Sequence, residues 1–182
     1  TGECGLEKVN RKSRDQEPEH WKRSVDVIAE IIIQNKPHVI FVPHENDMNT
    51  THVGTNLLVA DALHSLPESF CCWVCATEFW APMQDPNLMV EISVADLADL
   101  VAALSFHVGE VKRNPYHLRL PAWMQDNVRR GGELVGGQGS EAPSFIFATI
   151  YRLQKWTRKR LEKNENAGRF ISCNDSLKSI FG

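Results

Sequence analysis

The order of apolar and polar positions predicts alternating helices and strands along most of the chain. The first helical pattern begins at Pro18, because proline is tolerated in the first turn of a helix, and it ends at Asn35 and Lys36, since Pro37 cannot continue it. Its apolar face repeats at spacings of four, three and four residues: Trp21, Val25, Ile28 and Ile32. The continuous apolar run 39–42 then predicts a strand covered on both faces.

The same reasoning predicts the later elements. Strands are expected at 70–80, 88–94 and 145–153, and helices at 53–62, 95–106 and 121–133. Thr50 or Thr51 is available to cap the first of these helices, and Ser93 the second. The glycine-rich segment GGELVGGQG follows a helix and precedes a strand, so we expect a wide turn there and not a phosphate-binding loop.

Alternating helices and strands indicate an α/β fold: a Rossmann-like, largely parallel sheet flanked by helices. The strand number is low for a complete sheet of this kind, so we expect that its N-terminal portion is absent from these residues. We predict a polar arm at 1–17, an α/β domain at 18–156 and a peripheral basic and polar tail at 157–182.

Composition narrows the class of protein. The 182 residues are 42% hydrophobic and 24% charged, as in a soluble globular domain. The net charge of −3 gives no indication of nucleic acid or an anionic membrane as a partner. No apolar run approaches the roughly 18 residues needed to span a bilayer. The sequence leaves open whether the chain forms a homo-oligomer.

The cysteines favour a reducing compartment. Their number, five, is odd, and three of them (Cys71, Cys72 and Cys75) fall in the strand-like run FCCWVCATEFW. A CxxC pair can bind zinc or exchange electrons, but no second CxxC is present, so we interpret these thiols as buried core residues. We expect no disulfide scaffold and a cytoplasmic location.

The loop after the first strand carries the candidate chemistry. Between positions 44 and 52 it holds His44, Glu45, Asp47, Asn49 and His52, followed by a helix. Sites in open α/β sheets form at the carboxyl ends of strands, and imidazole and carboxylate groups are ligands for zinc. Asp, Asn and Thr are also ordinary turn and cap residues, and the histidines of a polar loop can simply be solvated, so the pattern alone leaves both readings open.

The chain resembles the PIG-L/LmbE-like family of zinc-dependent N-acetylglucosaminyl deacetylases from about residue 18 to residue 147. The stretch from Asp47 to His52, DMNTTH, parallels the family motif D-x-H-P-D-H between a strand and a helix. The similarity continues through TEFWAP (77–82), NLMVEIS (87–93), the helix ending at His107, and RRGGELVGGQGSEAPSF (129–145).

Two departures from the family pattern bear on activity. Asn49 stands in place of the first histidine of the motif, and Thr50-Thr51 in place of its Pro-Asp. The family's A-H-P-D-D motif, which carries two metal ligands and the general base, does not occur in these residues. We therefore expect the site to be incomplete within the chain.

The resemblance implies a role for each candidate residue. His52 would be a zinc ligand, Asp47 would orient it, and Asn49 would stabilise the oxyanion through its amide N–H₂. His44, Trp80 and His107 would face a small N-acetylated substrate such as an amino sugar, with Trp80 stacking on the ring. The alternative is a non-catalytic member of the family that serves as a binding or interaction module.

Overall fold

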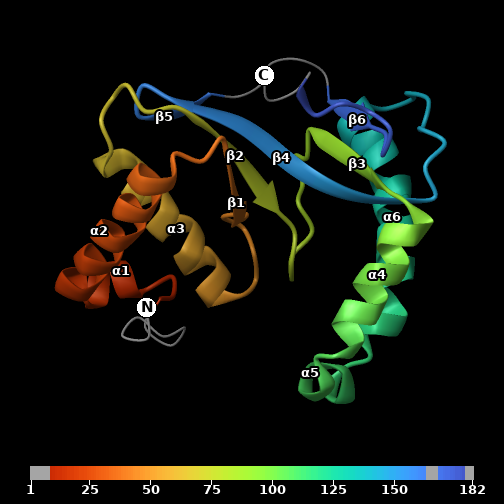
Figure 1. The fold of residues 1–182 in the computed structure, drawn as a ribbon, viewed down its shortest axis with the longest axis horizontal. Coiled ribbons are helices and arrows are strands. Elements are labelled where there is room, and N and C mark those ends of the chain that lie inside the picture. Colours follow the sequence, from red (N-terminus) through yellow and green to blue (C-terminus); the bar gives the residue numbers. More distant parts are fainter. Residues whose placement is uncertain (1–8, 163–167, 179–182) are drawn as a thin grey trace. The chain divides into compact units, whose positions relative to one another are not determined.

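The computed structural model describes residues 9–162 and 168–178 as helices and strands joined by short loops (Figure 1). The helices are α1 (Ser13–Gln16), α2 (Pro18–Asn35), α3 (Thr50–Ser65), α4 (Val94–Ser105), α5 (Val108–Arg113) and α6 (Tyr116–Gly136). The strands are β1 (Val39–Pro43), β2 (Cys72–Thr77), β3 (Leu88–Ile92), β4 (Phe147–Thr157), β5 (Arg160–Glu162) and β6 (Arg169–Ile171).

The strands form a mixed sheet in the order β1-β2-β4-β3-β6, with β5 paired to β4. β1 and β2 are parallel, as are β3 and β6, whereas β4 is antiparallel to β3 and to β5. The expected α/β class is therefore confirmed, and the described sheet is less uniformly parallel than the alternation of elements predicted.

The described residues fall into two compact units. The first contains residues 9–83 and 152–162, with α1, α2, α3, β1, β2 and β5. The second contains residues 84–151 and 168–178, with β3, α4, α5, α6 and β6. β4 crosses the boundary, because its residues 147–151 belong to the second unit and its residues 152–157 to the first.

The core of the first unit lies between α2, α3 and the β1–β2 pair. Trp21, Val25 and Ile32 of α2 are buried there, as the spacing predicted, and α2 ends at Asn35 with Lys36 in the left-handed conformation at φ 44°. Coverage of β1 on both faces is not confirmed. Val42 is buried, but Phe41 is exposed.

The second unit packs α6 closely against β3. A Cβ atom on Gly131 would lie 2.2 Å from Cε of Met89, so glycine lets the helix approach the strand. The expected loop at 131–139 is therefore wrong in part: α6 runs from Tyr116 through Pro121 to Gly136, and the turn begins at Gly137, where φ is +89°. Ser93 caps α4 as predicted, its Oγ accepting a hydrogen bond from the backbone N–H of Asp96.

Both ends of the chain contribute more than the sequence predicted. In the expected polar arm, Val9 and Ser13 are buried and α1 forms, while residues 1–8 lie outside the described residues. In the expected peripheral tail, β5 and β6 join the sheet. Residues 163–167 and 179–182 of that tail also lie outside the described part.

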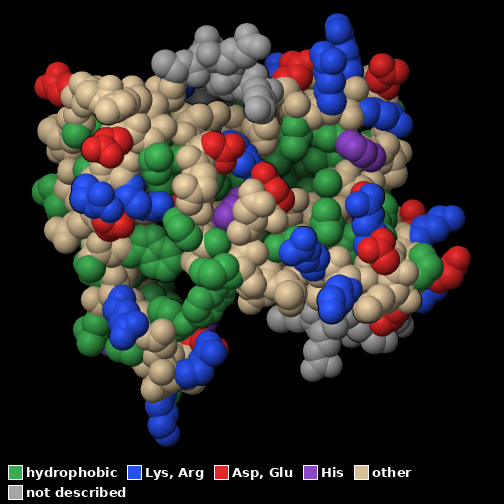
Figure 2. All heavy atoms as spheres, turned by 180° about the vertical axis from the view of Figure 1, so that it is seen from behind, with side chains coloured by type: hydrophobic (Ala, Val, Ile, Leu, Met, Phe, Trp, Pro, Cys, Tyr) green, Lys and Arg blue, Asp and Glu red, His purple; other side chains and the backbone are tan. Residues whose placement is uncertain are grey.

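The prediction that Cys71, Cys72 and Cys75 are buried is correct for two of the three. Cys72 and Cys75 are buried free thiols, and Cys71 is a free thiol that is exposed, contrary to expectation. Figure 2 shows acidic and basic side chains interspersed on the face that it draws. Within the described residues, no helix is both long and apolar enough to cross a bilayer.

Candidate functional site

The candidate site lies at the carboxyl ends of β1 and β2, two parallel neighbours in the first unit. Their ladder pairs Pro43 with Thr77 and continues past both strands, because the backbone N–H of His44 donates to the carbonyl of Thr77 at 3.1 Å. The Nδ2 group of Asn56 in α3 donates to the carbonyl of Pro43 at 2.8 Å. Hydrogen bonds thus connect the ends of β1 and β2 to each other and to α3.

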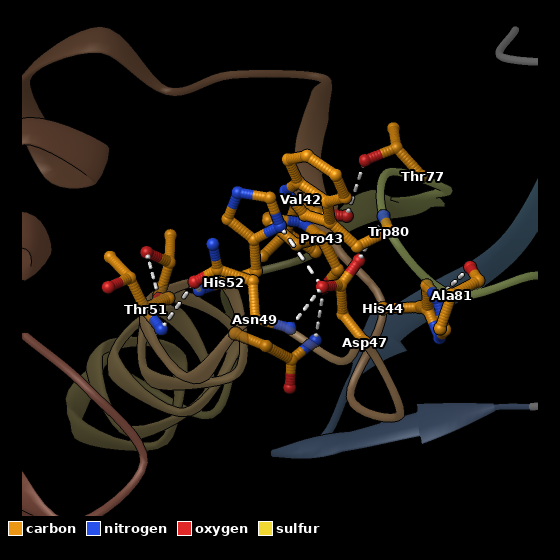
Figure 3. Close-up of polar contacts among 12 residues, drawn as sticks. Val42, Pro43, His44, Asp47, Asn49, Thr51, His52, Thr77, Trp80 and Ala81 are labelled. Atoms are coloured by element: carbon orange, nitrogen blue, oxygen red, sulfur yellow. Dashed lines mark hydrogen bonds and ion pairs between the residues drawn. The ribbon is translucent and has the colours of Figure 1, made fainter. Parts of the chain in front are cut away.

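Asp47 connects the two loops that leave these strands (Figure 3). Its Oδ1 accepts hydrogen bonds from the backbone N–H of Asn49 at 2.7 Å and from Nδ1 of His52 at 3.2 Å. Its Oδ2 accepts one from the backbone N–H of Trp80 at 3.0 Å. The side chain of Asp47 has no exposed surface, so this carboxylate is a buried anchor with three donors.

Those donors determine the charge of Asp47. Burial by itself raises the pKa of the carboxyl group, but the backbone N–H groups of Asn49 and Trp80, followed by the His52 ring, lower it to a net value below the ordinary 3.8. Asp47 is therefore an anion near neutral pH. An anion at Oδ1 requires the proton of the neutral His52 ring to sit on Nδ1.

This tautomer leaves Nε2 of His52 with a lone pair available. The side chain is 25% exposed, and Nε2 has no hydrogen-bond partner within the described part of the chain. One edge of the ring is held by a carboxylate while the other can bind a cation or accept a proton, which is the arrangement found around metal-bound histidines.

Asn49 caps the helix that carries His52. Its Oδ1 accepts hydrogen bonds from the backbone N–H groups of Thr51 at 2.8 Å and His52 at 3.4 Å. The capping role expected of Thr50 or Thr51 is thus wrong, and α3 begins one residue after Asn49. Because two N–H groups identify the capping atom as oxygen, Nδ2 of Asn49 points away from them and remains a donor.

An exposed apolar rim borders His52. The ring of Phe79 contacts the His52 ring with centroids 4.8 Å apart and planes tilted by 56°. Phe79 and Trp80 are 47% and 48% exposed, and Met48 in the other loop is exposed as well. Trp80 lies in the loop after β2, since that strand ends at Thr77 and not at residue 80 as predicted.

The structure places the other predicted substrate contacts differently. His44 is 1% exposed, and its Nε2 is 2.9 Å from the carbonyl oxygen of Ala81, so the side chain ties the first loop to the second inside the protein. This burial argues against contact with a substrate. His107 is exposed and lies in the second unit, at the residue before α5.

Two residues near the site gave no distinct signal in the sequence. Arg152 of β4 pairs with Glu45 in the loop after β1. Burial raises the pKa of Glu45, but the backbone N–H of Glu45 and then Arg152 bring it below the usual value. Phe79 is part of the TEFWAP segment, but its contact with His52 joins positions 27 residues apart in the sequence and becomes visible only in the fold.

The donor set fits one position of a zinc site. His52, oriented by Asp47, offers a neutral imidazole nitrogen of the kind that zinc binds. Across residues 9–162 and 168–178, no three His, Cys, Asp or Glu side chains gather in a metal-binding arrangement. Three protein ligands are usual in catalytic zinc sites, so the other ligands that zinc would need are not among the side chains grouped here.

The chain matches no protein-family model, and no curated protein matches it either. The geometry around His52 and the motifs in the sequence are therefore the observations that bear on function.

Proposed function

We propose that the protein contributes one ligand position to a metal-dependent deacetylase that acts on an N-acetylated sugar or a related small amide. The observation that carries the proposal is the hydrogen bond between Oδ1 of Asp47 and Nδ1 of His52 at the ends of two parallel strands. The proposal includes the Rossmann-like, largely parallel sheet that the resemblance to PIG-L/LmbE-like proteins implies, and the parallel pairing of β1 with β2 supports it.

In this proposal His52 would hold zinc through Nε2, and Asp47 would fix the ring and increase the basicity of that nitrogen. Bound zinc would polarise a water molecule and the amide carbonyl, which lowers the barrier to hydrolysis near neutral pH. The remaining ligands and the general base correspond to the A-H-P-D-D motif that the resemblance implies. Residues 1–182 alone are therefore expected to release no acetate.

The other residues have roles that follow from their positions. The free Nδ2 group of Asn49 would donate a hydrogen bond to the oxygen that gains negative charge during attack. An uncharged amide stabilises this charge less than an imidazolium and cannot pass on a proton. Phe79 and Trp80 would form an apolar wall beside the substrate, with the Trp80 indole against a sugar ring.

The test uses the natural gene product at its full length, supplied with zinc and incubated with a series of N-acetylated amino sugars, with acetate as the readout. We expect acetate release that is abolished in His52→Ala and lowered by about 10- to 100-fold in Asp47→Asn. His38→Ala is the matched control, because His38 is exposed and lies at the opposite end of β1.

Two outcomes would contradict the proposal. Zinc-loaded protein that releases no acetate from any of these sugars, and binds no zinc stoichiometrically, would favour the non-catalytic binding module. Activity that is retained in His52→Ala would show that the reaction takes place elsewhere in the molecule.

A further inference from the structure

The second unit exposes large apolar side chains at one end of a helical hairpin. Helices α4 and α6 run side by side, and α5 joins them at the end away from β3 (Figure 1). We refer to residues 105–123, which form this end, as the hairpin tip. Phe106, Val108 and Leu118 of the tip are 82%, 71% and 71% exposed, and Trp123 is partly exposed too.

The tip has little core of its own. No residue of α5 is buried, and Leu97, the buried residue of α4, lies near the opposite end of that helix. Exposed apolar residues scattered singly are normal on a protein surface, but several large apolar side chains exposed at one end of a helical hairpin indicate a contact surface. Packing within the second unit therefore does not explain why the tip carries these large apolar side chains.

Charge distinguishes the kind of partner. The tip contains three basic residues (Lys112, Arg113 and Arg119) and one acidic residue, Glu110, so its net charge is 3 − 1 = +2, whereas the whole chain carries −3. Glu110 is already paired with Arg113. Both carboxylates of α4, Asp96 and Asp99, lie in the half of that helix nearer to β3. Hydrophobic and basic side chains lie next to one another at the lower left of Figure 2, where the half rotation from Figure 1 brings the tip.

We propose that the hairpin tip docks on an anionic lipid surface. Large apolar side chains flanked by Lys and Arg are the composition by which peripheral segments enter the headgroup region, with the cations attracted to anionic lipids. These cations are attracted more strongly to a uniformly negative surface than to a protein partner of mixed charge. The overall charge of −3 concealed this feature, because the acidic residues lie elsewhere in the chain.

Co-sedimentation of the full chain with vesicles tests the proposal. One set of vesicles is made of phosphatidylcholine alone, and the other of equal parts phosphatidylcholine and phosphatidylglycerol. We expect binding to the anionic set that exceeds binding to the neutral set by at least about tenfold and that weakens as salt is added. This result does not depend on the proposed deacetylase activity.

Two pairs of substitutions locate the contact. Lys112→Gln with Arg119→Gln is expected to lower the partition constant roughly 25-fold, since each of the two cations near an anionic surface contributes about a factor of five. The matched control, Lys22→Gln with Arg23→Gln on the exposed face of α2, is expected to leave binding unchanged.

The apolar contribution is tested in the same way. Phe106→Ser with Leu118→Ser should lower binding at least tenfold. Ile31→Ser with Ile33→Ser removes exposed apolar surface from α2 and serves as the control.

Three results would overturn the proposal. The first is equal binding to both vesicle sets, and the second is tip variants that bind as the unmodified chain does. The third is a chain that binds no vesicles but self-associates, and that becomes monomeric in Phe106→Ser with Leu118→Ser. The last of these would assign the tip to contact with a second copy. Because every substituted side chain is exposed, the variants are expected to fold, and circular dichroism checks this for each one.

Discussion

Replacing Asp47 tests the anchor on which the candidate site depends. In Asp47→Ala, the backbone N–H groups of Asn49 and Trp80 lose their acceptor in a partly buried environment, and each unsatisfied group costs about 1–3 kcal/mol. The His52 ring can turn toward water, so it adds little. We therefore expect a loss of roughly 2–4 kcal/mol in the free energy of unfolding, at the lower part of the summed range because neither donor residue is fully buried: Asn49 is half-buried and Trp80 is exposed.

Asp47→Asn should cost less, because an amide keeps one oxygen acceptor. Its N–H₂ group then faces at least one donor, which leaves about 1–3 kcal/mol of destabilisation. Asp26→Asn, an exposed position on α2 in the same unit, is the control and should stay within about 0.5 kcal/mol of the unmodified chain. The measurement is urea unfolding followed by far-UV circular dichroism.

The pH dependence has a definite sign. The pKa of Asp47 is lowered in the folded protein, so its ionised form contributes stability that is fully present above the ordinary value of 3.8 and is lost as pH falls through the lower folded value. The difference between the unmodified chain and Asp47→Asn should therefore shrink below about pH 4. An Asp47→Ala chain as stable as the unmodified one at pH 7, or a difference that grows on acidification, would refute this reasoning.

Three further substitutions or reactions test local features of the fold. Asn49→Ala removes the cap of α3 and should destabilise the chain by about 1 kcal/mol in urea unfolding, whereas Asn49→Ser should restore most of the loss. Gly54→Ala would bring a Cβ to 2.6 Å from backbone atoms, so a loss of about 1–3 kcal/mol is expected, whereas Gly109→Ala meets nothing within 4 Å and should be neutral or slightly stabilising; equal effects would contradict the close packing. Burial raises the pKa of Cys72 to about 11 and that of Cys75 to about 12, so a thiol reagent at neutral pH should modify both only after denaturation, as mass spectrometry of the labelled peptides would show.

Local sequence signals predicted the elements whose boundaries are set by single residues. Pro37 ends α2 because proline cannot continue a helix, and Ser93 begins α4 because its hydroxyl accepts from a backbone N–H. The glycine-rich segment gave the opposite result. Gly131 and Gly132 usually favour a turn, but in this fold they let α6 approach its neighbours, and that approach is a tertiary property with no local signature.

Short elements and side-chain contacts were also beyond the sequence. β5 and β6 have three residues each, which is too few for a period to be recognised, and they exist as strands because of their pairing. In the candidate site, the contact between Asp47 and His52 was expected from the resemblance, in which Asp47 orients the zinc ligand. The burial of His44 was not, because it depends on the Ala81 carbonyl of a distant loop.

Asp47 holds the second loop through the backbone of Trp80 and not through its side chain. Oδ2 of Asp47 accepts a hydrogen bond from the backbone N–H of Trp80, and the indole takes no part in it. Every amino acid except proline provides this N–H group. Substituting Trp80 or Phe79 would thus change the apolar surface beside His52, while the hydrogen bond from Asp47 keeps the imidazole in its orientation. In the proposed substrate site, exchanging one or two rim residues would therefore alter which substrate fits while Asp47 still holds both loops.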